Sequence, residues 1–291
     1  MNTPFRITAV QAPPFSLDSD KTPFAEQITE ALDLAPGTRM LVFPELHLFH
    51  SILEAIALNH ASLRESAISL DDPLVTWFSE LAAEHNIWLI PGSICEKGPN
   101  GETFNTALVF NPQGELVTTY RKMFPWRPYE PYTPGEEFCV FEVPGVGRFG
   151  LNICYDAWFP EVSRSLAWMG AELIINIVKT TTPDRAQELV LARANSIVNQ
   201  VFTVSVNTAG PIGYGQSIIT GPEGEVISEA TGSDEMVLVC DFTRSAVARV
   251  RSVGTAGTNR MWDQFLPDDK KISLPIYNGY INPHNWNPAQ H

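Results

Sequence analysis

The amino-acid sequence predicts a layered α/β fold with a mixed β-sheet. Short apolar runs typical of buried strands alternate with segments of helical spacing along most of the 291 residues. Several strand segments are joined by short turns rich in Pro and Gly, and such turns connect antiparallel strands. No low-complexity linker divides the chain, so one domain is expected over residues 1–266.

The first part of the chain alternates strands and helices. Strands are expected at residues 7–12, 40–43 and 88–90, and helices at residues 24–34 and 74–83. Pro44 ends the second strand, and Asp72-Pro73 precedes the second helix. Proline has no backbone N–H and is favoured at the first helical position, so these residues mark element boundaries.

The remainder of the chain combines hairpins with two further helices. Hairpin turns are expected at residues 111–114, 144–147 and 221–224, and further strands at residues 173–178, 201–206 and 236–242. Helices are expected after Pro160 and after Pro183. Residues 267–291 are rich in Pro, Asn and aromatics and lack periodicity, which predicts an extended arm or a partner-contacting tail outside the core.

Charge and composition argue against several classes of partner. The formal net charge is −14 and the pI is about 4.8, whereas nucleic acids and anionic membranes need a basic protein face. The N-terminus lacks an apolar signal core, and no apolar stretch is long enough to cross a bilayer. We therefore expect a cytoplasmic protein with no nucleic-acid or membrane partner.

The four cysteines do not form a metal-binding or disulfide pattern. Cys95, Cys139, Cys154 and Cys240 are widely scattered, with neither a Cys-x-x-Cys pair nor a His-x-x-x-His pair near them. Free thiols in a reducing compartment are expected, and no metal site is predicted.

Cys154 stands at the end of an apolar run and just before a turn and a helix. The run covers residues 149–153, and the helical pattern opens at Pro160. A thiol in this place feels the positive end of a helix dipole, which lowers its pKa, and other hydrolases present a nucleophile on such an elbow. The local sequence is equally compatible with a small buried hydrophobe, which is what most free cysteines are.

Two carboxylates and one ammonium group stand near other strand ends. Glu45 comes directly after the second strand, and Lys122 follows the strand expected at residues 116–120. Glu130 lies among aromatic residues in a loop stiffened by prolines. Each residue alone is compatible with an exposed loop or a solvated strand end, but open α/β folds place ligands at the carboxyl ends of their strands.

Three motifs in this order resemble the nitrilase superfamily of carbon–nitrogen hydrolases. They are Phe-Pro-Glu at residues 43–45, Tyr-Arg-Lys at residues 120–122 and Cys-Tyr-Asp-x-x-Phe-Pro-Glu at residues 154–161. The resemblance covers the chain roughly from residue 10 to residue 262. It implies a nitrilase-like αββα sandwich with mixed sheets, which family members commonly pair into αββα–αββα, so a homodimer or a higher homo-oligomer is expected.

The resemblance also implies roles for the candidate residues. It assigns Cys154 as the nucleophile, Glu45 as the general base and Lys122 as the cation that stabilises the oxyanion. The stretch Lys-Met-Phe-Pro-Trp-Arg-Pro-Tyr-Glu at residues 122–130 is similar to the aliphatic amidase and formamidase branch, where a second glutamate follows the lysine by eight positions. Glu130 is therefore expected in the site, and neither a metal nor an organic cofactor is implied.

Residues near the cysteine are candidates for substrate binding. The backbone N–H of Tyr155 would be a second oxyanion donor, and the rings of Trp126, Tyr155 and Trp158 would form a wall for a small neutral acyl group. Thr180 follows a strand and is expected to line the pocket. Arg127 is a candidate for recognising carboxylated substrates.

Asp156 and Arg164 are expected to have structural roles near the elbow, as an ion pair. Neither is expected to be catalytic.

The predicted function is hydrolysis of a small linear amide to a carboxylic acid and ammonia through a cysteine thioester. The resemblance implies it, and Cys-Tyr-Asp at residues 154–156, in place of the Cys-Trp-Glu usual in nitrile hydrolysers, favours it. Hydrolysis of N-carbamoyl amino acids, ω-amides or nitriles on the same scaffold stays open as an alternative. A catalytically silent assembly protein is a further alternative, although all three triad residue types are present.

Overall fold

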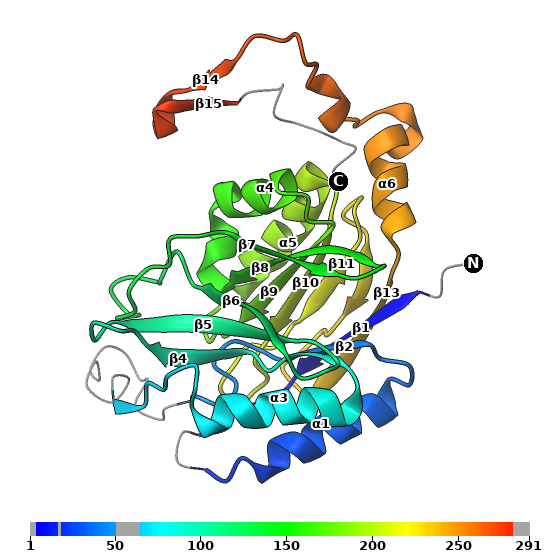
Figure 1. The fold of residues 1–291 in the computed structure, drawn as a ribbon. Helices are drawn as coiled ribbons and strands as arrows, with labels where there is room; N and C mark the ends of the chain where they lie inside the picture. Colours follow the sequence, from blue (N-terminus) through cyan, green and yellow to red (C-terminus); the bar gives the residue numbers. More distant parts are fainter. Residues whose placement is uncertain (1–3, 17–18, 51–64, 282–291) are drawn as a thin grey trace.

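The protein is described by a computed structural model that covers residues 4–16, 19–50 and 65–281. Two β-sheets lie face to face, with helices on both outer sides (Figure 1). All eight predicted site residues fall within the described part of the chain, whereas residues 282–291 of the predicted tail lie outside it.

The first sheet has seven strands. They are β1 (Phe5–Gln11), β2 (Met40–Val42), β3 (Trp88–Ile90), β4 (Ser93–Lys97), β5 (Thr103–Phe110), β6 (Leu116–Arg121) and β13 (Met236–Phe242). Their order is β13-β1-β2-β3-β5-β4, and β6 pairs with β5. β1, β2 and β3 are parallel and the other pairings are antiparallel, so the sheet is mixed as predicted.

The second sheet has six strands. They are β7 (Cys139–Val143), β8 (Gly147–Ile153), β9 (Leu173–Val178), β10 (Phe202–Asn207), β11 (Ile218–Thr220) and β12 (Val226–Glu229). They lie side by side in chain order, with β8, β9 and β10 parallel. The β7–β8 and β11–β12 hairpins form the two antiparallel edges, at the turns that the sequence predicts.

Helices cover the outer face of each sheet and complete the αββα sandwich. The helices α1 (Thr22–Leu34) and α3 (Pro73–His85) pack on the first sheet, and α4 (Pro160–Trp168) and α5 (Arg185–Asn199) pack on the second (Figure 1). This arrangement confirms the predicted fold.

Side chains of the parallel strands alternate between two apolar cores. In β2, Met40 and Val42 face the core between the sheets, whereas Leu41 packs toward the helices. In β9, Ile175 faces the inter-sheet core and Ile174 faces α4. Strands that are buried on both faces appear as continuous apolar runs, which explains why these strands could be predicted from the sequence.

The last described elements lie outside the two sheets. The helix α6 (Arg244–Val253) follows β13, and the strands β14 (Ile272–Leu274) and β15 (Gly279–Ile281) form a short hairpin beyond α4 (Figure 1). The sequence did not predict β4, α6 or this hairpin. It also placed the start of α5 at Pro183, whereas the helix begins at Arg185.

Candidate active site

Glu45 lies just past β2, at the carboxyl end of a central parallel strand. Its side chain is only 2% exposed. Oε1 accepts hydrogen bonds from Nζ of Lys122 at 3.0 Å and from Nδ2 of Asn105 at 2.7 Å. Asn105 is a buried residue of β5 that sequence analysis missed, although a polar side chain inside an apolar strand is a recognisable signal.

Lys122 follows β6 and joins the two predicted carboxylates. Its side chain is 0% exposed, and its Nζ lies 3.0 Å from the carboxylate of Glu45 and 2.8 Å from that of Glu130. Its backbone N–H donates to the carbonyl of Asn105, which fixes the chain at this point. A buried ammonium requires such paired charges, so the three residues form one electrostatic unit.

Glu130 lies in the loop after β6 and borders solvent. One carboxylate oxygen bonds Lys122, and Oε2 accepts the backbone N–H of Trp126 at 2.9 Å. The backbone N–H of Glu130 donates in turn to the carbonyl of Trp126 at 2.8 Å. The loop thus holds Glu130 against Lys122.

Cys154 stands where β8 ends and a 3₁₀ turn over residues Cys154–Trp158 begins. Its φ is +48°, in the left-handed region that few non-glycine residues adopt, and this conformation makes the predicted elbow. The sulfur is close enough to Glu45 and Lys122 for their charges to shift its pKa.

Asp156 fastens the elbow to the segment that carries Lys122. Its carboxylate accepts the backbone N–H of Ile153 at 2.9 Å and that of Phe124 at 2.8 Å, and the hydroxyl of Tyr120 at 2.8 Å. The predicted ion pair with Arg164 is therefore wrong, because backbone donors and a hydroxyl surround Asp156.

Arg164 has other contacts in the structure. It donates to the carbonyl of Val198 at 2.7 Å, and its guanidinium lies over the ring of Trp262.

Burial and charge keep the thiol protonated in this arrangement. Burial raises the pKa of Cys154 well above its ordinary value, and the charge of Glu45 adds to this effect, whereas Lys122 opposes it. This corrects the expectation that a helix dipole lowers the pKa of the thiol. Burial also raises the pKa of Glu45, which makes this carboxylate a stronger base.

Lys122 stays charged despite its burial. Desolvation alone would lower the pKa of its ammonium, but the charges of Glu130 and Glu45 outweigh that effect and raise the pKa well above its ordinary value.

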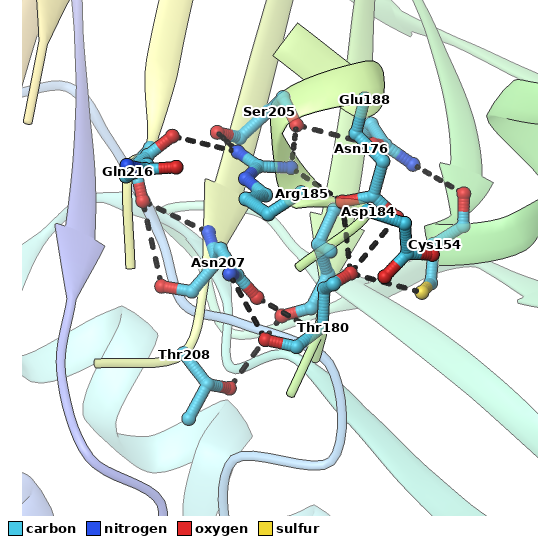
Figure 2. Close-up of polar contacts among 12 residues, drawn as sticks. Cys154, Asn176, Thr180, Asp184, Arg185, Glu188, Ser205, Asn207, Thr208 and Gln216 are labelled. Atoms are coloured by element: carbon cyan, nitrogen blue, oxygen red, sulfur yellow. Dashed lines mark hydrogen bonds and ion pairs between the residues drawn. The ribbon is translucent and has the colours of Figure 1, made fainter. Parts of the chain in front are cut away.

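Thr180 lies beside the sulfur and connects it to α5 (Figure 2). Its Oγ1 is 3.9 Å from Sγ of Cys154 and donates to the carboxylate of Glu188 at 2.8 Å. Nη1 of Arg185 lies 2.9 Å from the same carboxylate, and both α5 residues are buried. Sequence analysis missed Glu188 and Arg185, because charged residues on a helix usually face solvent.

The predicted aromatic residues form two pairs. The rings of Tyr155 and Trp158 are 6.0 Å apart, and Trp158 Nε1 lies 3.5 Å from Glu188. Trp126 packs on Tyr129 at 4.4 Å and is 38% exposed. Trp158 thus contacts the same Glu188 carboxylate as Thr180, and a wall formed by all three predicted rings stays a prediction.

The described residues contain no cluster of three or more His, Cys, Asp or Glu side chains able to hold a metal ion. Within the same residues, no helix combines the length and the apolar character needed to cross a membrane.

Comparison with known proteins places this chain among hydrolases of carbon–nitrogen bonds. The model of the carbon–nitrogen hydrolase family matches residues 6–252. A formamidase of Pseudomonas syringae pv. tomato is 31% identical over 221 residues, which are 74% of this chain and 63% of that protein. A formamidase of Bacillus cereus is 34% identical over 177 residues, 60% of this chain and 52% of that protein. The chain thus spans less than two thirds of the length of these curated relatives.

Solved structures agree with this comparison. The carbon–nitrogen hydrolase of Helicobacter pylori G27 has a TM-score of 0.77 at 26% identity, covering 91% of this chain and 95% of that one. Saccharomyces cerevisiae Nit3, a member of branch 10 of the nitrilase superfamily, has a TM-score of 0.76 at 26% identity, covering 89% and 97%. An amidase of Nesterenkonia sp. has a TM-score of 0.71 at 25% identity, covering 87% and 95%. This chain belongs to the carbon–nitrogen hydrolase family of the nitrilase superfamily.

Proposed function

We propose that this protein is an amidase, which hydrolyses a small linear amide to its carboxylic acid and ammonia through a thioester on Cys154. The observation that carries the proposal is the buried Lys122 ammonium, which bonds both Glu45 and Glu130 and whose charge acts on the sulfur of Cys154. Family membership and the formamidase and amidase relatives support the same reaction.

In the proposed reaction, Glu45 moves the protons. The sulfur of Cys154 attacks the amide carbon while its proton passes to Glu45, and Glu45 then gives that proton to the departing nitrogen as the C–N bond breaks. Ammonia leaves and a thioester remains. Glu45 next takes a proton from water, which attacks the thioester, and the sulfur recovers a proton as the acid leaves.

Lys122 stabilises the charge that develops on the amide oxygen in each tetrahedral intermediate. Its ammonium is already fixed by two carboxylates, so it needs no reorganisation when the oxyanion forms. The backbone N–H of Tyr155, next to the nucleophile, is the proposed second donor. Loss of one such donor typically costs about 3 kcal/mol in the transition state.

Glu130 and the aromatic side chains select the substrate in this proposal. A carboxylate next to Lys122 accepts an N–H of the amide, which a nitrile lacks, so Glu130 favours amides. The rings of Tyr155 and Trp158 suit a small neutral acyl group.

A substrate panel tests the proposed function. We expect purified protein to release ammonia from short unbranched amides from formamide to butyramide, and the Cys154→Ala variant to release none while it keeps its fold by circular dichroism. Hydroxylamine in the assay should divert the thioester to a hydroxamate. Ammonia release only from N-carbamoyl amino acids, ω-amides or nitriles would replace the amide assignment, and equal release by Cys154→Ala would remove the cysteine from the mechanism.

A further inference from the structure

A second buried ion pair lies beside Cys154 and has no part in the reaction proposed above. Glu188 and Arg185 are both on α5, and their side chains are buried behind Thr180 (Figure 2). Burying a carboxylate next to a nucleophile that must become negative is unfavourable for the reaction, because like charges repel. The burial of Glu188 and Arg185 near Cys154 therefore needs an explanation outside the proposed reaction.

The Thr180 hydroxyl stands between this carboxylate and the sulfur. A hydroxyl has one proton to donate, and Oγ1 of Thr180 lies 2.8 Å from both carboxylate oxygens of Glu188, which accept it. Toward Sγ of Cys154, at 3.9 Å, the hydroxyl therefore presents only lone pairs. A protonated thiol can donate to these lone pairs, whereas a thiolate would be repelled by them.

Several contacts fix the position of the Glu188 carboxylate. Nη1 of Arg185 bonds it at 2.9 Å, and Nε1 of Trp158 approaches it at 3.5 Å. Arg185 is itself fixed by Oγ of Ser205 at 3.1 Å and by the carbonyl of Gln216 at 3.0 Å. A charge-assisted acceptor held in this way keeps the Thr180 proton on the side away from the sulfur.

We propose that Glu188 is a positioning residue that acts through Thr180 to keep Cys154 a protonated thiol in the free enzyme. The inference rests on the proposed function only in taking Cys154 as the nucleophile. The sulfur then loses its proton only when a bound amide lets Glu45 accept it, so the free enzyme carries little reactive thiolate.

Other charged groups also act on the sulfur. Glu45 and Glu130 disfavour the thiolate together with Glu188, whereas the charge of Lys122 favours it. The charge of Arg185 also acts on the sulfur and, as a cation, favours the thiolate. A test must therefore change Glu188 and leave Glu45, Glu130 and Lys122 in place.

The Glu188→Gln variant tests this inference through the pH dependence of iodoacetamide labelling at Cys154, followed by mass spectrometry of the peptide. The new amide can donate to Thr180, which frees the hydroxyl proton for the sulfur. We expect the labelling midpoint to fall by about one pH unit. Labelling at pH 7 should be about threefold faster, because a tenfold gain in thiolate is partly offset by its weaker intrinsic nucleophilicity.

Glu172→Gln is the matched control. Glu172 is another buried carboxylate, paired with Arg244 at 2.8 Å, but it bonds the backbone at Arg148, at the start of β8, whereas Cys154 follows the end of that strand. This variant should lose thermal stability and keep the wild-type labelling midpoint. A Glu188→Gln midpoint that equals or exceeds that of wild type would overturn the inference, since a structural role predicts only the stability loss.

Thr180→Val provides a second route if Glu188→Gln does not fold. Valine has nearly the shape of threonine but accepts no hydrogen bond. In infrared difference spectra against Cys154→Ala, we expect the S–H stretching band of Cys154 to move to higher frequency in this variant. An unmoved band would overturn the inference. Labelling and infrared spectra need no substrate, so they remain decisive even if the panel finds no amide turnover.

Discussion

At the scale of single residues, Lys122 organises the candidate site. It is fully buried, it bonds two carboxylates that are far from each other in the sequence, and these carboxylates keep it charged. Glu45 is buried with it, whereas Glu130 reaches the solvent edge of the cluster. The two carboxylates therefore have different environments, which suits Glu45 to proton transfer and Glu130 to substrate recognition.

Glu130→Gln tests this division of roles. The amide keeps the shape of the side chain but cannot accept the substrate N–H and stabilise Lys122 as well as a carboxylate does. We expect kcat/KM to fall about 100-fold, the effect of losing one hydrogen bond between a charged group and the substrate. Glu136→Gln, in the exposed part of the same loop, should keep wild-type kcat/KM. Unchanged kinetics in Glu130→Gln would exclude Glu130 from the site.

His47 predicts a loss of stability in mild acid. Burial lowers the pKa of its ring to about 3, and the nearby charges of Lys179 and Lys21 act in the same direction. The ring contacts Oε1 of Gln27 at 2.8 Å and stacks on Phe43. An unfolded histidine takes up a proton near pH 6.5, so protonation favours the unfolded chain as the pH falls from about 6.5 toward 3.

His47→Phe should remove this part of the pH dependence. The contribution of His47 to the free energy of unfolding should drop by about 2 kcal/mol between pH 7 and pH 5, and phenylalanine keeps a ring but binds no proton. Urea unfolding at both pH values measures the difference. His85→Phe, at the end of α3, should keep the wild-type drop, and an equal drop in His47→Phe would contradict the assignment.

At the scale of elements, the elbow after β8 depends on one carboxylate. Asp156 bonds the end of β8, the loop after β6 and the side chain of Tyr120. It therefore sets the position of Cys154 relative to Lys122, although it belongs to neither the proposed triad nor the proposed substrate-binding residues.

Asp156→Asn should weaken both the elbow and the reaction. An amide can accept only on one side, so at least one of the three donors loses its partner, at a cost of about 2 kcal/mol in the free energy of unfolding. We expect a lower melting temperature and a lower kcat. Asp241→Asn, which breaks an exposed ion pair with Arg6, should change stability by less than about 1 kcal/mol. Wild-type turnover in Asp156→Asn would show that the elbow holds without it.

The elements predicted well from the sequence are those whose own residues carry a clear hydrophobic pattern or a capping residue. β2 and β9 are continuous apolar runs. Asp72 caps the start of α3, and its side chain accepts the N–H of Leu74 at 2.9 Å. α6 was missed because only Val247 and Val250 are buried along it, which leaves a weak periodic signal.

The predicted site residues and the missed ones differ in the same way. Glu45, Lys122, Glu130 and Cys154 stand in motifs that resemble a known family, so they could be named from the sequence. Asn105 and Glu188 lie in motif-free segments, and their importance comes from contacts between distant elements. Spacing along one segment does not encode such contacts.

At the scale of the whole molecule, the outer helices differ in exposed apolar surface. On α5, Val190 is 66% exposed, and Ile197, two turns further along the same face, is also exposed. Met169, just after α4, is exposed as well. The predicted homodimer or higher oligomer would bury such a surface, whereas isolated exposed apolar residues are common and need no partner.

Val190→Glu tests whether α5 lies in a subunit interface. We expect wild-type protein to sediment as a dimer or larger assembly and the variant to shift toward the monomer, because a buried unpaired charge opposes association. Leu34→Glu is the matched control. Leu34 is the last residue of α1, on the other helical layer, and its side chain is 73% exposed, so this variant should keep the wild-type assembly. A wild-type monomer at micromolar concentration would contradict the oligomer prediction.

The backbone conformation at Cys154 costs stability, whereas the side chain at this position is needed for the proposed reaction. A residue with a Cβ atom in the left-handed region is less stable than glycine there by roughly 1 kcal/mol. A Cys154→Gly substitution would therefore relieve strain and also delete the proposed nucleophile. Selection for thermal robustness alone would favour that glycine, and the resulting chain would be inert in the proposed reaction.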